Sequence, residues 1–117
     1  MSWLDTNLLK LTENYLRLTA VRESLVANNI ANIDTPHYRT RDINFNAELE
    51  RAAMDTPQSL NPATREVPGL LERPDGNNVD MDREGLLLAE MQLQYSMGVQ
   101  LVRQQFKRLQ TAINEGQ

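Results

Sequence analysis

The feature that most constrains the fold is a pair of long apolar stripes with helical spacing, one near each end of the chain. In the N-terminal segment, residues 1–36, apolar side chains recur at steps of four and three, with Arg22 at one repeat position. This period of 3.5 residues predicts a long helix with one apolar face. The stripe consists of Leu4, Leu8, Leu11, Tyr15, Leu18 and Leu25. Pro36 ends the segment, because proline lacks the N–H group that a helix needs.

The C-terminal segment, residues 80–117, carries the second stripe. Its apolar positions again follow steps of three and four, and they are Leu88, Met91, Tyr95, Val99, Val102, Phe106, Leu109 and Ile113. Asp80 is expected to cap the start of this helix, because an aspartate oxygen can accept hydrogen bonds from the free N–H groups of the first turn. We therefore expect a second long helix.

The middle of the chain, residues 37–79, is expected to be a connector with turns. Four of the five prolines lie there, and proline is not tolerated inside a helix. Phe45 and Leu49, with two alanines after them, can line one face of a short helix. Thr64–Val67 is short for a strand, although the segment has room for a small hairpin. The run from Pro74 to Asn78 has the composition of a turn.

Together these segments predict a mainly α fold. The long N- and C-terminal helices are expected to pair as an antiparallel coiled-coil hairpin, with a short irregular or small β segment between them. Both helices also carry apolar residues beside the stripe, such as Leu16 on the first and Leu93 and Leu101 on the second. These residues widen the apolar surface beyond a two-helix seam. We therefore expect other copies or sister chains to supply a further layer of packing, and the isolated chain to be partly disordered at both ends.

Residues suited to catalysis or metal binding are scarce. The chain has no cysteine and one histidine, which excludes thiolate catalysis and zinc–thiolate sites. That histidine, His37, has no partner placed by a motif. Asp80, Asp82 and Glu84 resemble the start of a calcium loop, but the twelfth position, which needs a bidentate glutamate, is Met91. We expect a capped helix start there, no catalytic or metal-binding residues, no cofactor, no small-molecule substrate and no enzymatic activity.

The net charge and the N-terminal residues exclude further classes of partner and location. The formal net charge of −4 argues against a nucleic-acid partner, since phosphate binding needs a basic face. The N-terminus has no basic region followed by an apolar run, so no cleaved signal peptide is expected. No stretch approaches the apolar length that spans a membrane.

An unusual group of asparagines lies at the end of the first predicted helix. Asparagine is a poor residue inside a helix, because its amide competes for backbone groups. Such amides can also specify the register between helices. The segment consists of Ala27, Asn28, Asn29, Ile30, Ala31, Asn32, Thr35, Pro36 and Tyr38.

This segment resembles the N-terminal signature of the flagellar rod and hook axial proteins. His37 departs from the signature at a place where glycine or asparagine is common. The residues Asp75–Glu84, which lead into the last helix, and Arg41–Phe45 are similar to the proximal rod subunits of the B type, with the C type as the runner-up. The stretch 46–74 matches no motif of the family and is short for it.

The resemblance implies a structural subunit of the proximal rod in the periplasmic part of the flagellar basal body. Such a subunit would polymerise through its terminal helices, transmit torque and enclose the export channel. The implied partners are other copies, other flagellar rod proteins, a membrane-ring or export-gate adaptor at the rod base, and the flagellar type III export apparatus. A competing interpretation is a soluble helical-hairpin adaptor that binds a partner helix, which explains the stripes but not the asparagines.

Overall fold

The computed structural model describes residues 3–54 and 61–116, with side chains from Thr6 onward. The elements follow the order α1 (Trp3–Ala31), β1 (Arg41–Ile43), α2 (Phe45–Ala53), β2 (Thr64–Glu66) and α3 (Met81–Glu115). The prediction of a mainly α fold with two long terminal helices is confirmed.

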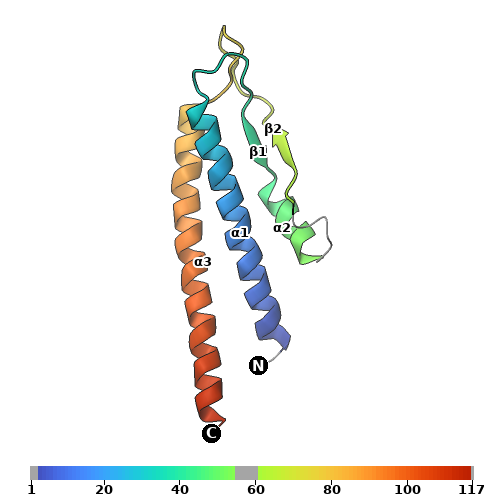
Figure 1. Ribbon diagram of the computed structural model, residues 1–117, viewed down its shortest axis with the longest axis vertical. Helices are drawn as coiled ribbons and strands as arrows, with labels where there is room; N and C mark the ends of the chain where they lie inside the picture. The colour runs from blue at the N-terminus through green and yellow to red at the C-terminus, as the bar shows by residue number, and fades with distance from the viewer. Residues whose placement is uncertain (1–2, 55–60, 117) are drawn as a thin grey trace.

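Helices α1 and α3 lie side by side and run in opposite directions (Figure 1). Near the connector, Asn29 of α1 contacts Glu84 of α3, and towards the other end Thr12 contacts Gln105. The described part of the chain is therefore a rod-like body, with extents of 68 × 27 × 18 Å. The start of α1 and the end of α3 both lie away from the tip where the connector joins these two helices (Figure 1).

The ends of the long helices have local causes. α1 ends at Ala31, where the N–H groups of Asn32 and Ile33 still bond to carbonyl groups of the last turn before the chain leaves through Pro36. At the start of α3, the Asp80 carboxylate accepts hydrogen bonds from the N–H groups of Asp82 and Arg83, at 3.0 and 3.4 Å. The predicted N-cap is confirmed.

The connector forms a small arm against α1, on the side away from α3 (Figure 1). The predicted short helix is present as α2, and Asn44 caps it by accepting a hydrogen bond from the Ala47 N–H group. β1 and β2 pair antiparallel, with Asp42 opposite Arg65. Because α2 lies between the two strands in the chain, they do not form a tight hairpin.

The apolar core is small and lies near the connector. Its centre is Val26, Leu87 and Met91, with Ile30 and Leu88 packed against it. More polar than apolar side chains are buried among the described residues, so apolar packing alone does not hold this end together. The buried polar residues are Thr12, Thr19, Asn29, Thr40, Asp42, Glu48, Asn77, Asn78 and Glu84.

Candidate functional site

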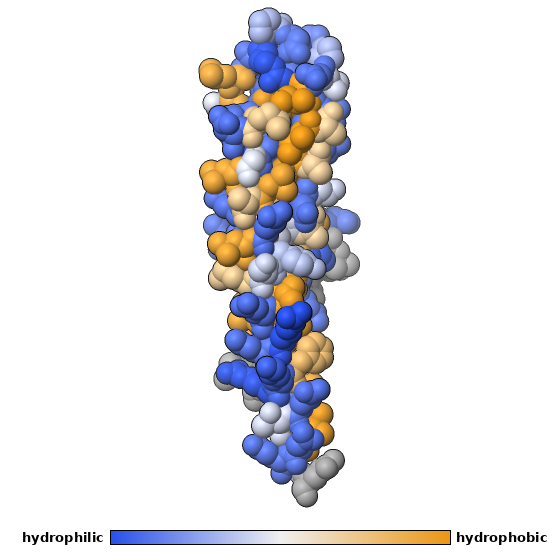
Figure 2. Space-filling model, turned by 90° about the vertical axis from the view of Figure 1, so that its left-hand side faces the viewer, coloured by the Kyte–Doolittle hydropathy of each residue, from blue (hydrophilic) through white to orange (hydrophobic). Residues whose placement is uncertain are grey.

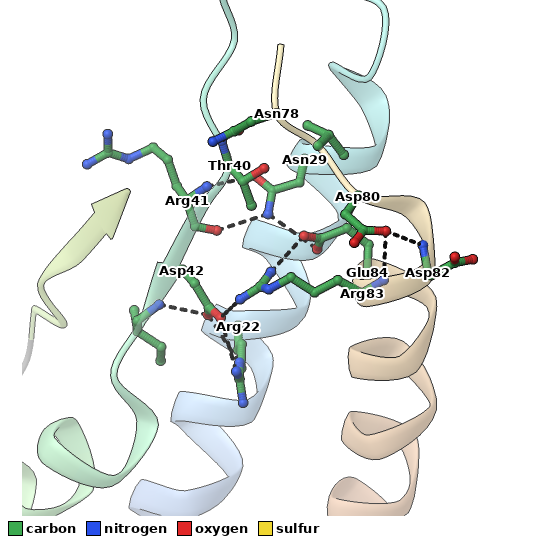
Figure 3. A network of polar contacts seen from close by, with 12 residues as sticks. Arg22, Asn29, Thr40, Arg41, Asp42, Asn78, Asp80, Asp82, Arg83 and Glu84 are labelled. Atoms are coloured by element: carbon green, nitrogen blue, oxygen red, sulfur yellow. Dashed lines mark hydrogen bonds and ion pairs between the residues drawn. The ribbon is translucent and has the colours of Figure 1, made fainter. Parts of the chain in front are cut away.

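Asn29, in the last turns of α1, is the centre of a buried polar network at the connector end (Figure 3). Its amide nitrogen donates to the Arg41 carbonyl group at 2.9 Å and to the Glu84 carboxylate at 3.3 Å. Its amide oxygen accepts from the Arg41 N–H group at 3.1 Å and from the Tyr38 hydroxyl at 2.8 Å. A single side chain thus joins α1 to β1 and α3, which requires the paired donor and acceptor of a carboxamide.

A chain of alternating charges continues the network (Figure 3). Arg22 donates through two nitrogens to the two Asp42 oxygens, at 3.1 and 3.0 Å. Arg83 bridges the two buried carboxylates, with 2.6 Å to Asp42 and 2.7 Å to Glu84. Each buried carboxylate therefore has a guanidinium partner, as buried charges require. The chain of charges connects α1, β1 and α3.

The environment of Asp42 favours its charged form. Burial alone would raise the pKa of this carboxyl group. Hydrogen bonds from Arg22, from the Ile43 N–H group and from Arg83, together with the charge of Arg22, outweigh burial and hold the pKa of Asp42 below its usual range. The ion pairs therefore stay intact at neutral pH.

Two further asparagines tie the segment before α3 to the residues that follow α1 and to the residue before β1. The buried amide of Asn77 donates to the carbonyl groups of Asn32 and Thr35, both at 2.9 Å. The Asn78 side chain accepts from the Thr40 N–H group at 2.7 Å. Two of the segments that carry the family resemblance are thus in direct contact, through residues that lie 42 and 45 positions apart.

Two residues in the turns near this contact have left-handed backbone conformations. Gly76 has φ of +83°, and His37 has φ of 64°. The His37 N–H group donates to the Asp75 carbonyl group at 2.9 Å, which holds the two turns together. Glycine adopts this conformation at no steric cost, whereas histidine does not.

The remaining residues of the asparagine segment form local contacts or face outward. Asn28 donates to the Tyr38 hydroxyl at 3.1 Å, and burial is the largest cause of the raised pKa of Tyr38. Asn32 donates to the Asn28 carbonyl group and accepts from the Thr35 hydroxyl. Ile30 packs against the apolar core. The exposed residues of the segment include Ala27, Ala31 and Pro36.

We call this whole network the clasp. It consists of Arg22, Asn28, Asn29, Asn32, Thr35, Tyr38, Thr40, Arg41, Asp42, Arg73, Asn77, Asn78, Arg83 and Glu84. Arg73 belongs to it because its guanidinium donates to the carbonyl groups of Ile33 and Val79. The clasp fixes where α3 begins relative to where α1 ends.

The predicted stripe of α1 is divided between the interior and the surface. Leu18 is buried, and Tyr15 and Leu25 are half-buried. Leu8 and Leu11 are exposed, by 38% and 45%. The predicted position Leu4 lies outside the side chains that the structure describes.

The predicted stripe of α3 is divided in the same way. Met91 is buried, whereas Tyr95, Phe106 and Ile113 are exposed by 51%, 57% and 56%. The half-buried positions are Leu88, Val99, Val102 and Leu109. The buried side of α3 runs through Leu87, Met91 and Gly98. The predicted stripe shares Met91 with this buried side, and its other residues lie beside it or on the surface.

A second apolar surface lies on the other edge of α3. Its exposed residues are Leu86, Leu93, Met97 and Leu101. Figure 2 looks onto the α3 side of the molecule and shows two columns of apolar side chains along its upper part, with polar side chains between them. Met97 and Leu101 also line a groove of about 290 Å³ together with Leu8, Leu11 and Leu49. Apolar surface is thus left uncovered on both sides of α3.

The close approach of the long helices depends on a small residue. A methyl group added at Gly98 would lie 2.6 Å from Leu16 Cδ2 and 3.1 Å from its Cγ atom. These distances are shorter than van der Waals contact, so the absence of a side chain at Gly98 allows α1 and α3 to approach.

The sequence-based predictions give no polar partners to several clasp residues. Arg22 interrupts the apolar stripe of the N-terminal helix, and this interruption is the one sequence signal that it has a polar partner. The ion pairs of Asp42 with Arg22 and Arg83, and the hydrogen bond of Arg73 to Ile33, carry no such signal, because these partners lie 20 to 41 residues apart.

Within residues 3–54 and 61–116, no group of three or more His, Asp or Glu side chains is placed to hold a metal ion. Among the same residues, no helix is long and apolar enough to cross a membrane. The residues brought together are hydrogen-bond donors, acceptors and ion pairs that bond to one another, although the buried Thr40 hydroxyl has no hydrogen-bond partner among the described residues. Their arrangement holds segments in position.

The comparisons with known proteins agree on one family, although no family model matches the chain. The flagellar basal body rod protein FlgB of Escherichia coli (strain K12) is 34% identical over 129 residues, which cover 92% of this chain and 94% of that protein. FlgB of Borrelia hermsii is 32% identical, and FlgB of Cereibacter sphaeroides is 36% identical over 84% of this chain. The chain therefore belongs to the FlgB family of flagellar basal body rod proteins, which confirms the predicted role as a structural rod subunit rather than an enzyme.

Proposed function

We propose that this chain is a subunit of the proximal rod and that it assembles through the apolar surfaces that its own fold leaves uncovered. The observation that carries the proposal is the apolar surface on both edges of α3. Tyr95, Phe106 and Ile113 lie on one edge, and Leu93 and Met97 lie on the other, each more than half exposed. A single chain that exposes so much apolar surface needs neighbours to cover it.

Within the subunit, we propose that α1 and α3 pack as an antiparallel coiled coil. Support comes from the spacing of the buried residues of α3, with Leu87, Met91 and Gly98 at steps of four and seven. Val26 of α1 packs against Leu87 and Met91. A step of seven returns to the same side of a helix after two turns, as a heptad repeat requires.

The role of the clasp in this proposal is to set the register of that pair. Coiled coils with uniform apolar seams can slide by one repeat, and buried polar groups oppose such slippage. The Asn29–Glu84 hydrogen bond and the Arg83–Asp42 ion pair each require one alignment of α3 against α1 and β1. The residues 1–36 and 80–117 would then act as axial helices, and residues 37–79 as the connector that joins them.

The proposed partners are other copies of the chain, other rod proteins and an adaptor at the membrane-ring or export-gate end of the rod. We further propose that the chain leaves the cytoplasm through the flagellar type III export apparatus, that it functions in the periplasm, and that its helices enclose the export channel. Torque transmission would follow from a stiff wall of packed helices. Family membership supports the association with rod proteins.

The competing interpretation from the sequence is a soluble adaptor, since a hairpin with exposed apolar edges can also bind a partner helix. The clasp does not distinguish the two functions, since either would benefit from a fixed register. The FlgB relatives favour the rod subunit, and they favour the B type over the C type of proximal rod subunit.

The experiment that tests the proposed function is deletion of the gene in its host, with motility assays and electron microscopy of isolated basal bodies. We expect non-motile cells whose basal bodies have membrane rings and no rod, and recovery of both features with the wild-type gene. Motile cells with complete rods, in a host without a second copy of the gene, would leave the adaptor as the better account.

A further inference from the structure

We propose that the C-terminal part of α3, from Leu101 to Glu115, binds the surface of an anionic lipid bilayer when the subunit is not assembled. The segment lies along the bilayer as an amphipathic helix, with apolar side chains in the interface and basic side chains against the lipid phosphates. The inference concerns the single chain, and it requires no contact between copies.

One side of this segment is apolar and only partly covered. Val102, Phe106, Leu109 and Ile113 follow one another at steps of four, three and four, so they share one side of the helix. Phe106 is 57% exposed and Ile113 is 56% exposed, while Val102 and Leu109 are half-buried. A helix with an exposed aromatic ring and a branched aliphatic side chain on the same side suits the boundary between headgroups and acyl chains.

Positive charge lies beside this apolar side. Arg103 and Lys107 are both exposed, and their spacing of four residues places them one above the other on the helix. Phe106 lies one turn after Arg103 and directly before Lys107. Between Gln92 and Asn114 the sequence contains no acidic residue. A helix that combines a basic polar side with an apolar side is typical of proteins that bind anionic membrane surfaces.

The negative net charge of the whole chain does not oppose this contact, because the charges are segregated along the molecule. Of the 12 basic and 16 acidic residues, three basic ones and no acidic one lie between Gln92 and Asn114. This segment lies away from the connector tip (Figure 1), along a body that is 68 Å long. Exposed charges are screened beyond about 10 Å at 0.1 M salt. A bilayer at the C-terminal end of α3 is therefore shielded from the acidic residues near the tip.

Helix α1 leaves this surface accessible. At the end away from the connector tip, α3 extends past the start of α1 (Figure 1), and residues 110–116 are all exposed. Where the two helices still lie side by side, Gln105 contacts Thr12. The charged residues nearest to Thr12 in α1 are Lys10 and Glu13, one of each sign. Helix α1 thus adds no net negative charge at this contact.

The arrangement favours a bilayer over an acidic protein as the partner. An interfacial helix buries its apolar side about 5–10 Å into the boundary between headgroups and acyl chains. With Phe106 and Ile113 at that depth, Arg103 and Lys107 on the neighbouring side of the helix reach the level of the phosphates. A bilayer offers both kinds of surface along the full length of the segment, which is about 22 Å at 1.5 Å per residue.

Vesicle sedimentation with the purified full-length chain tests the inference. We expect the chain to sediment with vesicles of phosphatidylcholine that contain about one third phosphatidylglycerol, and to stay in solution with vesicles of phosphatidylcholine alone. Binding should be lost at about 1 M salt, where the screening length falls to about 3 Å. Circular dichroism should show a gain of helix when the anionic vesicles are added, because the bilayer orders the end of α3.

Substitutions locate the contact on α3. Phe106→Ser with Ile113→Ser is expected to weaken binding at least about tenfold, since the helix loses its exposed apolar side chains. Arg103→Gln is expected to weaken it about fivefold, the effect of one basic residue near an anionic surface. Matched controls are Leu93→Ser, on the other edge of α3, and Arg65→Gln, in β2, because both residues are exposed. Both controls should bind as the wild type does.

The outcomes separate this inference from the proposed function. No sedimentation with the anionic vesicles, equal binding to both kinds of vesicle, or equal weakening by the controls would overturn the lipid contact. An acidic protein would then be the better partner for the basic segment. A chain that fails to bind vesicles but restores rods in the deletion strain would overturn this inference alone. Complete rods in the deletion strain itself would instead count against the proposed function.

Discussion

At the scale of single residues, the buried charges of the clasp are the groups that most need specific charged partners. Asp42 has an almost fully buried carboxylate, and its stabilisation depends on Arg22 and Arg83, whose side chains are 18% and 22% exposed. Removing one partner from such a group leaves the others without compensation.

We predict that Asp42→Asn lowers the free energy of unfolding by about 3 kcal/mol, because two guanidinium groups lose their shared carboxylate. Urea unfolding at neutral pH measures this loss. Glu90→Gln, which changes an exposed carboxylate of α3 in the same way, serves as the control and is expected to stay within about 0.5 kcal/mol of the wild type. Equal effects of the two substitutions would contradict the importance of the ion pairs.

The same residue predicts a pH dependence of stability. The pKa of Asp42 is lower in the folded state than in the unfolded chain, so the folded state binds fewer protons. Its contribution to stability is therefore complete above the unfolded pKa of about 3.9 and is lost as the pH falls through the lower folded value. In unfolding measured from pH 6 to pH 2, Asp42→Asn should lack that part of the acid destabilisation. A variant with the same acid profile as the wild type would refute this assignment.

For His37, in contrast, we predict a substitution that raises the free energy of unfolding. Its φ of 64° disfavours most side chains but is well tolerated by asparagine. His37→Asn is expected to raise the free energy of unfolding by about 0.5 kcal/mol, and His37→Val to lower it by about 1 kcal/mol, since β-branched residues are poorest there. Thermal unfolding of both variants checks the order, and a more stable valine variant would show that the turn conformation is different.

At the scale of elements, the contact between α1 and α3 depends on Gly98. We predict that Gly98→Leu destabilises the chain by about 2 kcal/mol, because the new side chain has no space against Leu16. Apart from its chain neighbours and its own helix backbone, Gly85 in the same helix has no atom within 4 Å of an added Cβ atom. Gly85→Leu should therefore stabilise α3 by up to about 0.8 kcal/mol through helix propensity. Urea midpoints compare the pair, and a neutral Gly98→Leu would mean that the helices are not closely packed there.

The elements also show what the sequence can and cannot predict. The 3.5-residue period predicts both long helices, and Asp80 and Asn44 are local signals that mark real helix starts. The side of α3 that meets α1 is harder to predict, because Leu87, Leu93 and Tyr95 lie on three sides of one helix and periodicity alone does not rank them.

The contacts within the clasp are even harder to predict from the sequence. Asn29 is recognisable as an unusual residue inside a helix, but its partner Glu84 lies 55 residues away. The pairing of β1 with β2 also depends on contacts across the connector, and each strand has only three residues. Side-chain pairing at such separations follows from the folded arrangement, which no local pattern contains.

At the scale of the whole molecule, stability is expected to be uneven. The apolar core and the clasp both lie near the connector, whereas Leu8, Leu11, Phe106 and Ile113 are exposed towards the other end. We predict that backbone amides of residues 6–15 and 106–115 exchange hydrogen rapidly in the isolated chain, while those of residues 22–30 and 84–91 are protected. Circular dichroism should show less helix than two complete long helices. Uniform protection along both helices would contradict this prediction.

The family relationship fits a molecule built in this way. The alignment with the Escherichia coli relative runs over 129 residues, whereas this chain has 117, so the relative contains residues that this chain lacks. The clasp and the two long helices are present nonetheless.

The central claim is that the apolar surfaces left uncovered by the fold carry rod assembly, and one substitution experiment tests it most directly. Leu93→Ser with Phe106→Ser changes one exposed residue on each edge of α3, and Gln100→Ser with Gln104→Ser changes two exposed polar residues of the same helix as a control. Each variant is expressed in the deletion strain, and rods are counted by electron microscopy of isolated basal bodies. The account predicts membrane rings without rods for the first variant, with the protein present at wild-type levels, and complete rods for the control. Complete rods in both strains would contradict it.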